Sequence, residues 1–258
     1  MPHILLTNDD GVDAPGLLAL AQAFAGLGRI SIVAPDHNWS ASGHVKTMHR
    51  PLRVRPTRLA DGTPAFSSDG APSDCVALAV LGIVEGKIDL VVSGINPNAN
   101  IGHDVTYSGT VTAAMEAAIS GVAGMAVSLD SPEYHTGPLD FRAAARVAAA
   151  IARQVLERGL PGGVLLNINV PGLAFEGLKG VVITRQGLRV YRDALVTRED
   201  PRGRPYYWIG GGPPTGVADA GTDFWALQEG FVSVTPLQLD LTANEQLLAL
   251  EAWNLILD

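Results

Sequence analysis

Five apolar segments of strand length recur along the first two thirds of the chain. They are residues 4–8, 30–34, 88–93, 125–129 and 164–170. Continuous apolar runs of this kind are typical of parallel strands that helices cover on both faces. The apolar spacing between the runs predicts helices, which we place at residues 13–24, 71–84, 108–118 and 140–158. The alternation predicts an α/β fold, namely a Rossmann-like, doubly wound, mostly parallel sheet.

Local signals refine this picture at several points. Asp13 stands where it would cap the first helix, with Pro15 in its first turn. Residues 52–54 and 65–67 are predicted to form short strands of an excursion from the main sheet. Cys75 falls in the first turn of the 71–84 helix, where it is most simply a small core residue.

The pattern changes near residue 180. Strand-like runs at 181–184, 206–209 and 231–235 are separated by Gly/Pro-rich stretches, which favours antiparallel hairpins. Residues 242–257 are predicted to form a helix with a broad apolar face, which must pack on its own core or on a partner subunit. We therefore divide the chain into a Rossmann-like core, residues 1–180, and a C-terminal region of hairpins and helix, residues 181–258.

Three of the predicted strands end in oxygen-rich stretches. Asp9 and Asp10 follow the first strand, Ser40 lies in the polar loop after the second, and Asn96 follows the strand at 88–93. Since the carboxyl ends of parallel strands meet at one edge of the sheet, these four side chains can converge there. Two carboxylates with two neutral oxygen ligands suit Mg²⁺ or Mn²⁺ rather than Zn²⁺.

A second feature suits an anion. Ser108 is placed to cap the alanine-rich helix that follows it, and Gly109 would let an anion approach the backbone at the helix start. A metal, an anion site and a water molecule are the equipment for hydrolysing a phosphate ester, with either acid of the pair as general base. Each motif alone also has a purely structural interpretation, because Asp-Gly is a common turn and Ser-Gly-Thr a common helix cap.

Composition narrows the classes of function. Of 258 residues 47% are hydrophobic and 17% charged, so a sizeable core can form and disorder is not expected. A net charge of −8 argues against binding a nucleic-acid polymer. Cys75 is the only cysteine, which excludes an internal disulfide and a cysteine-based metal site. We see no signal peptide and no apolar run long enough to span a membrane, so the cytoplasm is the expected location.

Several longer motifs resemble one known family. The chain reads LTNDDGV at 6–12, APG at 14–16, SGIN at 93–96, DVTYSGTV at 104–111 and AAME at 113–116. Further matches are VAPD at 33–36, LNINVP at 166–171, DPRG at 200–203, GTD at 221–223 and TPL at 235–237. Together they resemble the SurE (survival protein E) family of 5'-nucleotidases over nearly the whole chain.

This resemblance implies a divalent-metal-dependent phosphohydrolase that releases nucleoside and phosphate from nucleoside 5'-monophosphates by attack of water. It implies one Mg²⁺ or Mn²⁺ per subunit, held by Asp9, Asp10, Ser40 and Asn96, with Asp9 and Asn96 as catalytic residues. It assigns phosphate binding to Asn96, Ser108, Gly109 and Thr110. It also implies a homodimer that exchanges C-terminal segments, or a homotetramer of such dimers. Base preference, and cleavage of 3'-nucleotides or short polyphosphate, stay open.

The sequence also departs from the family pattern. Ser42 stands close to Ser40, and Asn98 occupies a position where the family usually has glycine. Trp39 could stack on a base or wedge into its own loop. His44 and His103 could donate a proton to the leaving ribose oxygen or be structural.

Three rival functions fit the sequence less well. A covalent aspartyl phosphatase of the haloacid-dehalogenase type needs an Asp-x-Asp spacing, which the adjacent Asp9 and Asp10 do not supply. A non-hydrolytic nucleotide-binding sensor or scaffold needs no second carboxylate beside the anion. A hydride- or methyl-transfer enzyme is weaker still, because the G-x-G-x-x-G fingerprint is absent.

Overall fold

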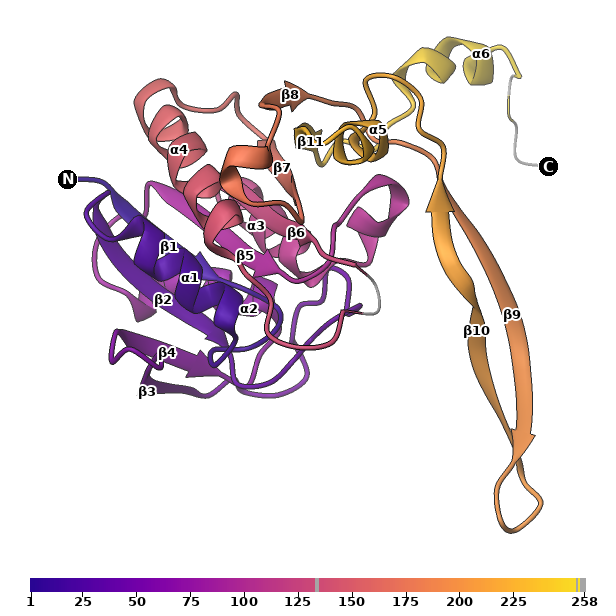
Figure 1. Ribbon diagram of the computed structural model, residues 1–258, viewed down its shortest axis with the longest axis horizontal. Coiled ribbons are helices and arrows are strands. Elements are labelled where there is room, and N and C mark those ends of the chain that lie inside the picture. Colours follow the sequence, from indigo (N-terminus) through magenta and orange to yellow (C-terminus); the bar gives the residue numbers. More distant parts are fainter. Residues whose placement is uncertain (133–134, 254, 256–258) are drawn as a thin grey trace.

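A nine-stranded mixed sheet with helices on both faces forms the body of the protein, and a long two-stranded arm projects from it (Figure 1). The computed structural model describes residues 1–132, 135–253 and 255. The strand order across the sheet is β3 (Val54–Arg58), β4 (Pro64–Ser68), β2 (Arg29–Pro35), β1 (His3–Thr7), β5 (Leu90–Asn96), β6 (Ala123–Asp130), β7 (Val164–Pro171), β11 (Val232–Gln238) and β8 (Val181–Ile183). The strands from β4 to β7 in this order run parallel, while β3 and β11 run antiparallel to their neighbours β4 and β7.

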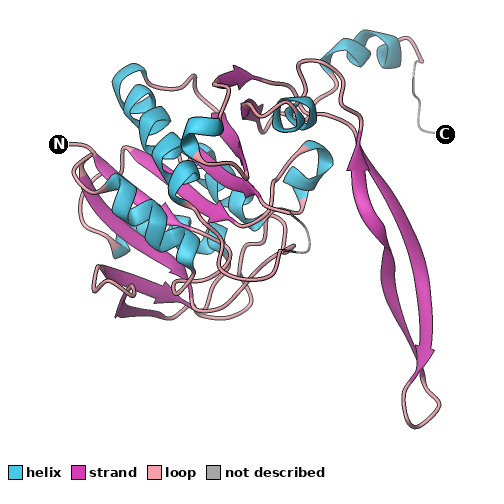
Figure 2. Ribbon diagram, in the orientation of Figure 1, coloured by secondary structure: helices cyan, strands magenta, loops and turns pink. Residues whose placement is uncertain are grey.

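Helices cover both faces of β1, as its unbroken apolar run predicts. Ile4 and Leu6 pack with helices α1 (Pro15–Phe24) and α4 (Arg142–Arg158), while Leu5 packs on the opposite face with α2 (Pro72–Leu78) and α3 (Gly109–Ile119). All three side chains are fully buried. Successive strand residues point to opposite faces, so a strand between two helical layers needs apolar residues at every position. The predicted α/β class is confirmed (Figure 2).

Several boundaries differ from the sequence-based prediction. The prediction that Asp13 caps the first helix is wrong. Asp13 is exposed, and the N-cap position falls on Ala14, with Pro15 as the first helical residue. The strand predicted at 52–54 begins only at Val54. Helix α2 ends at Leu78 and continues as a π-helical turn, Ala79–Ile83, that contains Gly82 at φ +122°. Cys75 is buried in the core, as predicted.

The C-terminal region is only partly a set of hairpins. β9 (Arg189–Glu199) and β10 (Pro205–Gly216) pair antiparallel and form the arm. In contrast, β8 and β11 are strands of the main sheet, and they pair parallel to each other, so the hairpin prediction for 181–184 and 231–235 is wrong. The sheet thus continues beyond residue 180, and the division of the chain into residues 1–180 and 181–258 stays a prediction.

The chain end forms less helix than its apolar pattern predicts. A 3-10 turn, Asn244–Gln246, leads into the short helix α6, Leu247–Glu251, in place of a helix over 242–257. Residues 254 and 256–258 of that prediction lie outside the described residues. None of the residues of α6 is buried, and Leu248 is 80% exposed in the described part of the chain.

A buried acid joins the base of the arm to the body. Asp223 begins helix α5 (Asp223–Gln228) and is fully buried. Its carboxylate accepts hydrogen bonds from the backbone N–H groups of Gly102 (2.8 Å) and Gly187 (2.7 Å). Gly102 begins the 3-10 helix η2 (Gly102–Thr106), and Gly187 lies two residues before β9. The start of the arm is therefore held against the segment that precedes α3.

Candidate active site

The strand order reverses at β1, which places a crevice at the carboxyl ends of β1 and its neighbours. β2 pairs with one edge of β1 and β5 with the other. In open α/β sheets, ligands bind in the crevice at such a switch point. The three oxygen-rich stretches that the sequence placed at strand ends, residues 8–10, 36–44 and 96–100, belong to these three adjacent strands.

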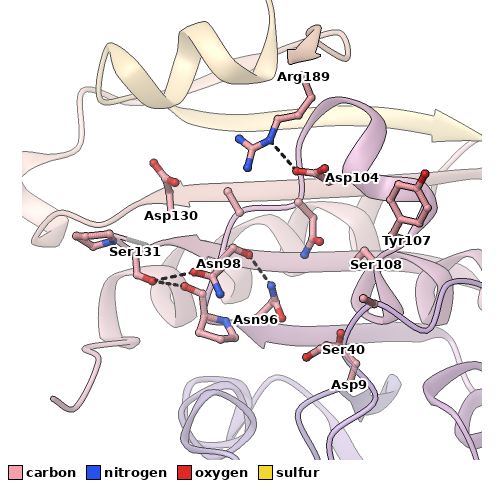
Figure 3. A pocket seen from close by; sticks show the side chains of 15 residues that line it. Asp9, Ser40, Asn96, Asn98, Asp104, Tyr107, Ser108, Asp130, Ser131 and Arg189 are labelled. Carbon is pink, nitrogen blue, oxygen red and sulfur yellow. Dashed lines mark hydrogen bonds and ion pairs between the residues drawn. The ribbon is translucent and has the colours of Figure 1, made fainter. Parts of the chain in front are cut away.

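A cavity of about 700 Å³ opens at this edge (Figure 3). Four of the residues selected from the sequence line it: Asp9, Ser40, Asn96 and Ser108. The other lining residues are Ala41, Pro97, Asn98, Ala99, Asn100, Asp104, Tyr107, Asp130, Ser131, Pro132 and Arg189. The structure therefore brings together side chains from β1, β5, β6, the loop after β2 and the start of α3.

Asp9 and Asp10 are crowded carboxylates with different surroundings. Burial raises the pKa of Asp9. The hydroxyl of Thr110, which donates a hydrogen bond to Asp9 Oδ1, acts in the opposite direction but does not cancel this rise. Burial, together with the charge of Asp9, raises the pKa of Asp10 to about 7. Asp10 does not line the cavity that holds Asp9; it lines an adjoining cavity of about 510 Å³, with Pro97 common to both. Either a proton or a cation must relieve this concentration of negative charge.

Backbone hydrogen bonds hold the loop that carries Ser40 over Asp9. Trp39 N donates to Asp9 O (2.8 Å), and Gly43 N donates to Tyr107 O (2.9 Å) just before α3. Asn38 Oδ1 accepts from Ser40 N (2.7 Å), which fixes the turn at Ser40 itself. The next residue, Ala41, has φ +58°, a conformation that non-glycine residues rarely adopt and that recurs at functional sites.

Asn96 presents its amide oxygen for a ligand. It is the last residue of β5, and its Nδ2 donates to the carbonyl oxygen of Asn98 (2.5 Å). Because the amide nitrogen is engaged, Oδ1 is the atom left to face the cavity. An amide oxygen is a common ligand of hard cations.

The start of α3 lies directly against Asp9. Ser108 caps the helix, its hydroxyl accepting from Val111 N (3.1 Å). A Cβ at Gly109 would lie 2.7 Å from Asp9 Cβ and 3.0 Å from Asp9 Oδ2, so only glycine permits this approach. Of the residues predicted to bind phosphate, Asn96 and Ser108 line the cavity, whereas Gly109 and Thr110 are buried against Asp9.

The structure also places the side chains whose roles the sequence left open. Ser42 is not among the residues that line the cavity, and its hydroxyl is buried without a hydrogen-bond partner among the described residues. Trp39 packs beside His37, with ring centroids 5.1 Å apart. His44 Nε2 is within hydrogen-bonding distance of Glu116 Oε2 on α3 (3.1 Å). Like Trp39 and His44, His103 is not among the lining residues.

Three charged residues of the cavity were not selected from the sequence. Asp104 lies in η2, Asp130 ends β6 and Arg189 begins β9. Asp130 follows a predicted strand, so the strand-end argument that selected Asp9 and Asn96 would also have found it. No local signal points to Arg189, which reaches the cavity only through the fold.

The donor set determines which metal the site fits. Among the described residues, no group of three or more His, Cys, Asp or Glu side chains is arranged to hold a metal ion. A cation in this cavity would rest on Asp9 with the neutral oxygens of Ser40 and Asn96, and it would meet Asp10 only from the side of the adjoining cavity. Such a set fits Mg²⁺ or Mn²⁺, which keep several waters, and does not fit Zn²⁺.

The doubly wound sheet and the oxygen-rich cavity at its switch point define an α/β protein with a ligand site at its carboxyl edge. The family model described as "Survival protein SurE" matches residues 4–193. The chain belongs to the SurE family. Within the described residues, no helix combines the length and apolar character that crossing a membrane requires.

Individual relatives match over nearly their full length. The chain is 51% identical over 251 residues to "5'-nucleotidase SurE" of Chloroflexus aggregans, covering 97% of this chain and 98% of that protein. It is 52% identical over 254 residues to "5'-nucleotidase SurE" of Herpetosiphon aurantiacus, covering 98% and 99%. Among solved structures, the SurE protein from Aquifex aeolicus matches with a TM-score of 0.82 and 41% identity, covering 98% of this chain and 100% of that one.

Proposed function

We propose that this protein is a divalent-metal-dependent 5'-nucleotidase, which hydrolyses nucleoside 5'-monophosphates to nucleoside and phosphate. The observation that carries the proposal is the contact between Asp9, which lines the cavity, and the buried first turn of α3 beside it. A helix start favours an anion, and here the carboxylate of Asp9 already lies against it. A phosphate bound beside Asp9 would therefore need a cation between the two negatively charged groups. Two relatives that match over nearly their full length are named 5'-nucleotidases.

In this proposal, separate groups of residues bind the metal and orient the phosphate. Asp9, Asp10, Ser40 and Asn96 would hold one Mg²⁺ or Mn²⁺. When bound, the cation supplies polarisation of a phosphoryl oxygen and acidification of a water molecule. Asn96 and the first turn of α3, residues 108–110, orient the phosphate. The cavity holds the nucleoside, while Asp9 and Asn96 are the catalytic residues.

The direct test is phosphate release from AMP, GMP and p-nitrophenyl phosphate, measured with EDTA, with Mg²⁺ and with Mn²⁺. We expect turnover with either cation and its loss in EDTA, because two adjacent carboxylates hold no phosphate without a cation between them. Turnover that survives EDTA would contradict metal dependence. Nucleotide binding without turnover under any condition would favour the rival function, a nucleotide-binding sensor. The same assay with 3'-AMP tests the 3'-nucleotide activity that the sequence left open.

We also propose that the protein is a homodimer, or a homotetramer built from such dimers, in the cytoplasm. The support is apolar surface that this chain leaves uncovered. Ile209 on the arm is 84% exposed, and Leu248 on α6 is 80% exposed. Large apolar side chains gathered on projecting elements usually mark an interface. Sedimentation equilibrium is expected to give at least twice the 27.0 kDa of one chain; a monomer across micromolar concentrations would contradict the proposal.

A further inference from the structure

Two polar side chains of β7 lie in the interior of the protein. Asn167 and Asn169 are both fully buried. They are two positions apart, so they lie on the same face of the sheet as Leu165, which packs with Val111 and Ala114 of α3. A buried amide costs stability unless it is hydrogen bonded, so the partners of these two side chains indicate their role.

Both asparagines bind the backbone of Asn100. Asn169 Oδ1 accepts a hydrogen bond from Asn100 N (2.8 Å), and Asn169 Nδ2 donates to Asn100 O (3.1 Å). Asn167 Nδ2 donates to the same carbonyl oxygen (2.7 Å). The side-chain amide of Asn169 thus pairs with one residue through both its N–H and its C=O, as two residues do across an antiparallel ladder. The main chain at Asn100 is held on β7 by three hydrogen bonds.

The segment that ends at Asn100 spans the ends of three neighbouring strands. It begins at Asn96, the last residue of β5, and β6 lies between β5 and β7 in the sheet. The side chain of Asn100 donates to the hydroxyl of Ser128 on β6 (2.8 Å). Ser128 and Asn169 pair with each other in the register of β6 and β7. Asn100 is therefore fixed to both strands.

This segment forms one wall of the cavity, because residues 96–100 all line it. Figure 3 shows Asn96 beside Asn98, whose carbonyl oxygen accepts from Asn96 Nδ2 (2.5 Å). Ser131 Oγ donates to Pro97 O (2.5 Å) in the same wall. Since the amide nitrogen of Asn96 is bound to this segment, the direction of Asn96 Oδ1 depends on the path that the segment takes to Asn100.

Stability alone does not account for the two asparagines. Asn167 Oδ1 is buried without a hydrogen-bond partner among the described residues. An unpaired buried acceptor lowers the free energy of unfolding, and an apolar side chain of similar shape would avoid this cost. A role in placing the cavity wall explains why an amide stands at this position.

We propose that Asn167 and Asn169 are positioning residues for Asn96. By holding the backbone of Asn100 they set the path of residues 97–100, and so aim Asn96 Oδ1 at the cation. Neither asparagine is among the described residues that line the cavity, so no contact with cation or substrate is assigned to them. The inference rests on the proposed metal-dependent 5'-nucleotidase function.

The test is the affinity for Mn²⁺ without substrate, measured from the electron paramagnetic resonance signal of free Mn²⁺. Asn169→Leu removes two of the three hydrogen bonds to the Asn100 backbone, and we expect it to raise the Kd about tenfold or more, as loss of a residue behind a metal ligand typically does. Asn167→Leu removes one bond and also the unpaired oxygen. It should raise the Kd by a smaller factor, about threefold, while the free energy of unfolding in urea changes little.

Thr235→Val is the matched control. Thr235 is 2% exposed and pairs with Asn167 in the register of β7 and β11. Its hydroxyl is hydrogen bonded to that of Thr184 (2.7 Å), away from the cavity wall. The variant should lower the free energy of unfolding and leave the Kd for Mn²⁺ unchanged.

Weaker Mn²⁺ binding in Asn169→Leu, with normal binding in Thr235→Val, supports the positioning role. An unchanged Kd in Asn169→Leu, or an equal rise in Thr235→Val, overturns it. If Asn169→Leu does not fold, Asn167→Leu decides, because it keeps both bonds of Asn169; an unchanged Kd there also overturns the role. Absence of Mn²⁺ binding by the unmodified protein overturns the proposed metal dependence, and the positioning role with it.

Discussion

Replacing Asp9 by asparagine is expected to reduce metal-dependent phosphate release from AMP by about a thousandfold or more. Loss of a residue that only supports a metal ligand typically lowers activity or affinity about 10- to 100-fold, so loss of the ligand charge itself should exceed this. Asparagine keeps the size of the side chain and an oxygen that can accept from Thr110, so the start of α3 should stay in place. The variant therefore separates the charge of Asp9 from its structural role.

The measurement combines activity with binding. kcat/KM for AMP is compared with the shift that Mn²⁺ causes in the midpoint of thermal unfolding. In the unmodified protein Mn²⁺ should raise the midpoint, because it relieves the repulsion between Asp9 and Asp10; in Asp9→Asn this rise should largely vanish. Asp13→Asn is the matched control, since Asp13 is a nearby but exposed acid. Normal turnover with a normal Mn²⁺ shift in Asp9→Asn would refute the assignment of the metal site.

Gly109→Ala is expected to lower kcat/KM by about a hundredfold, the effect of a misplacement of roughly 1 Å in an active site. The added methyl group would meet the side chain of Asp9 at 2.7 Å, so the acid or the first turn of α3 must shift. Alanine is otherwise well suited to a first helical position, and the helix itself should persist. The effect on activity should therefore be much larger than the effect on the free energy of unfolding.

Gly162→Ala provides the control for this substitution. A Cβ at Gly162 meets no atom within 4 Å, and its backbone does not have a positive φ. Both variants are assayed for turnover and for unfolding in urea. If Gly109→Ala turns over AMP like the unmodified protein, the close contact between α3 and Asp9 does not matter for catalysis. If the Gly109→Ala variant unfolds, the contact between α3 and Asp9 is required for folding rather than for catalysis.

Some features of the site followed from local rules. Asp9, Ser40 and Asn96 were selected because polar residues followed apolar runs, and parallel strands bring their ends to one edge. The prediction did not require knowing the strand order, since any doubly wound sheet has this property. Ser108 as a helix cap likewise depends only on its neighbours, and its hydroxyl accepts from Val111 N as expected.

Other features of the fold and the site depend on contacts between parts of the chain that are far apart in sequence, so local patterns do not predict them. Asp10 is adjacent to Asp9 in sequence, yet the two side chains line different cavities, because the direction of a side chain after a strand depends on the turn that follows. The strands β8 and β11 looked like a separate hairpin region, because short apolar runs between glycines do not reveal which edge they will join. The edge of β7 was available to β11, and pairing there satisfies backbone groups of both strands.

Local sequence patterns were sufficient to predict the class of fold, the apolar strands with two covered faces, and most of the acidic and amide side chains at the sheet edge. These properties depend on periodicity and on residues a few positions apart. The tertiary structure alone decided that Arg189 reaches the cavity and pairs with Asp104, 85 positions away by their numbers. Such a contact depends on where the arm leaves the sheet, which Asp223 fixes through backbone groups that carry no sequence signal of their own.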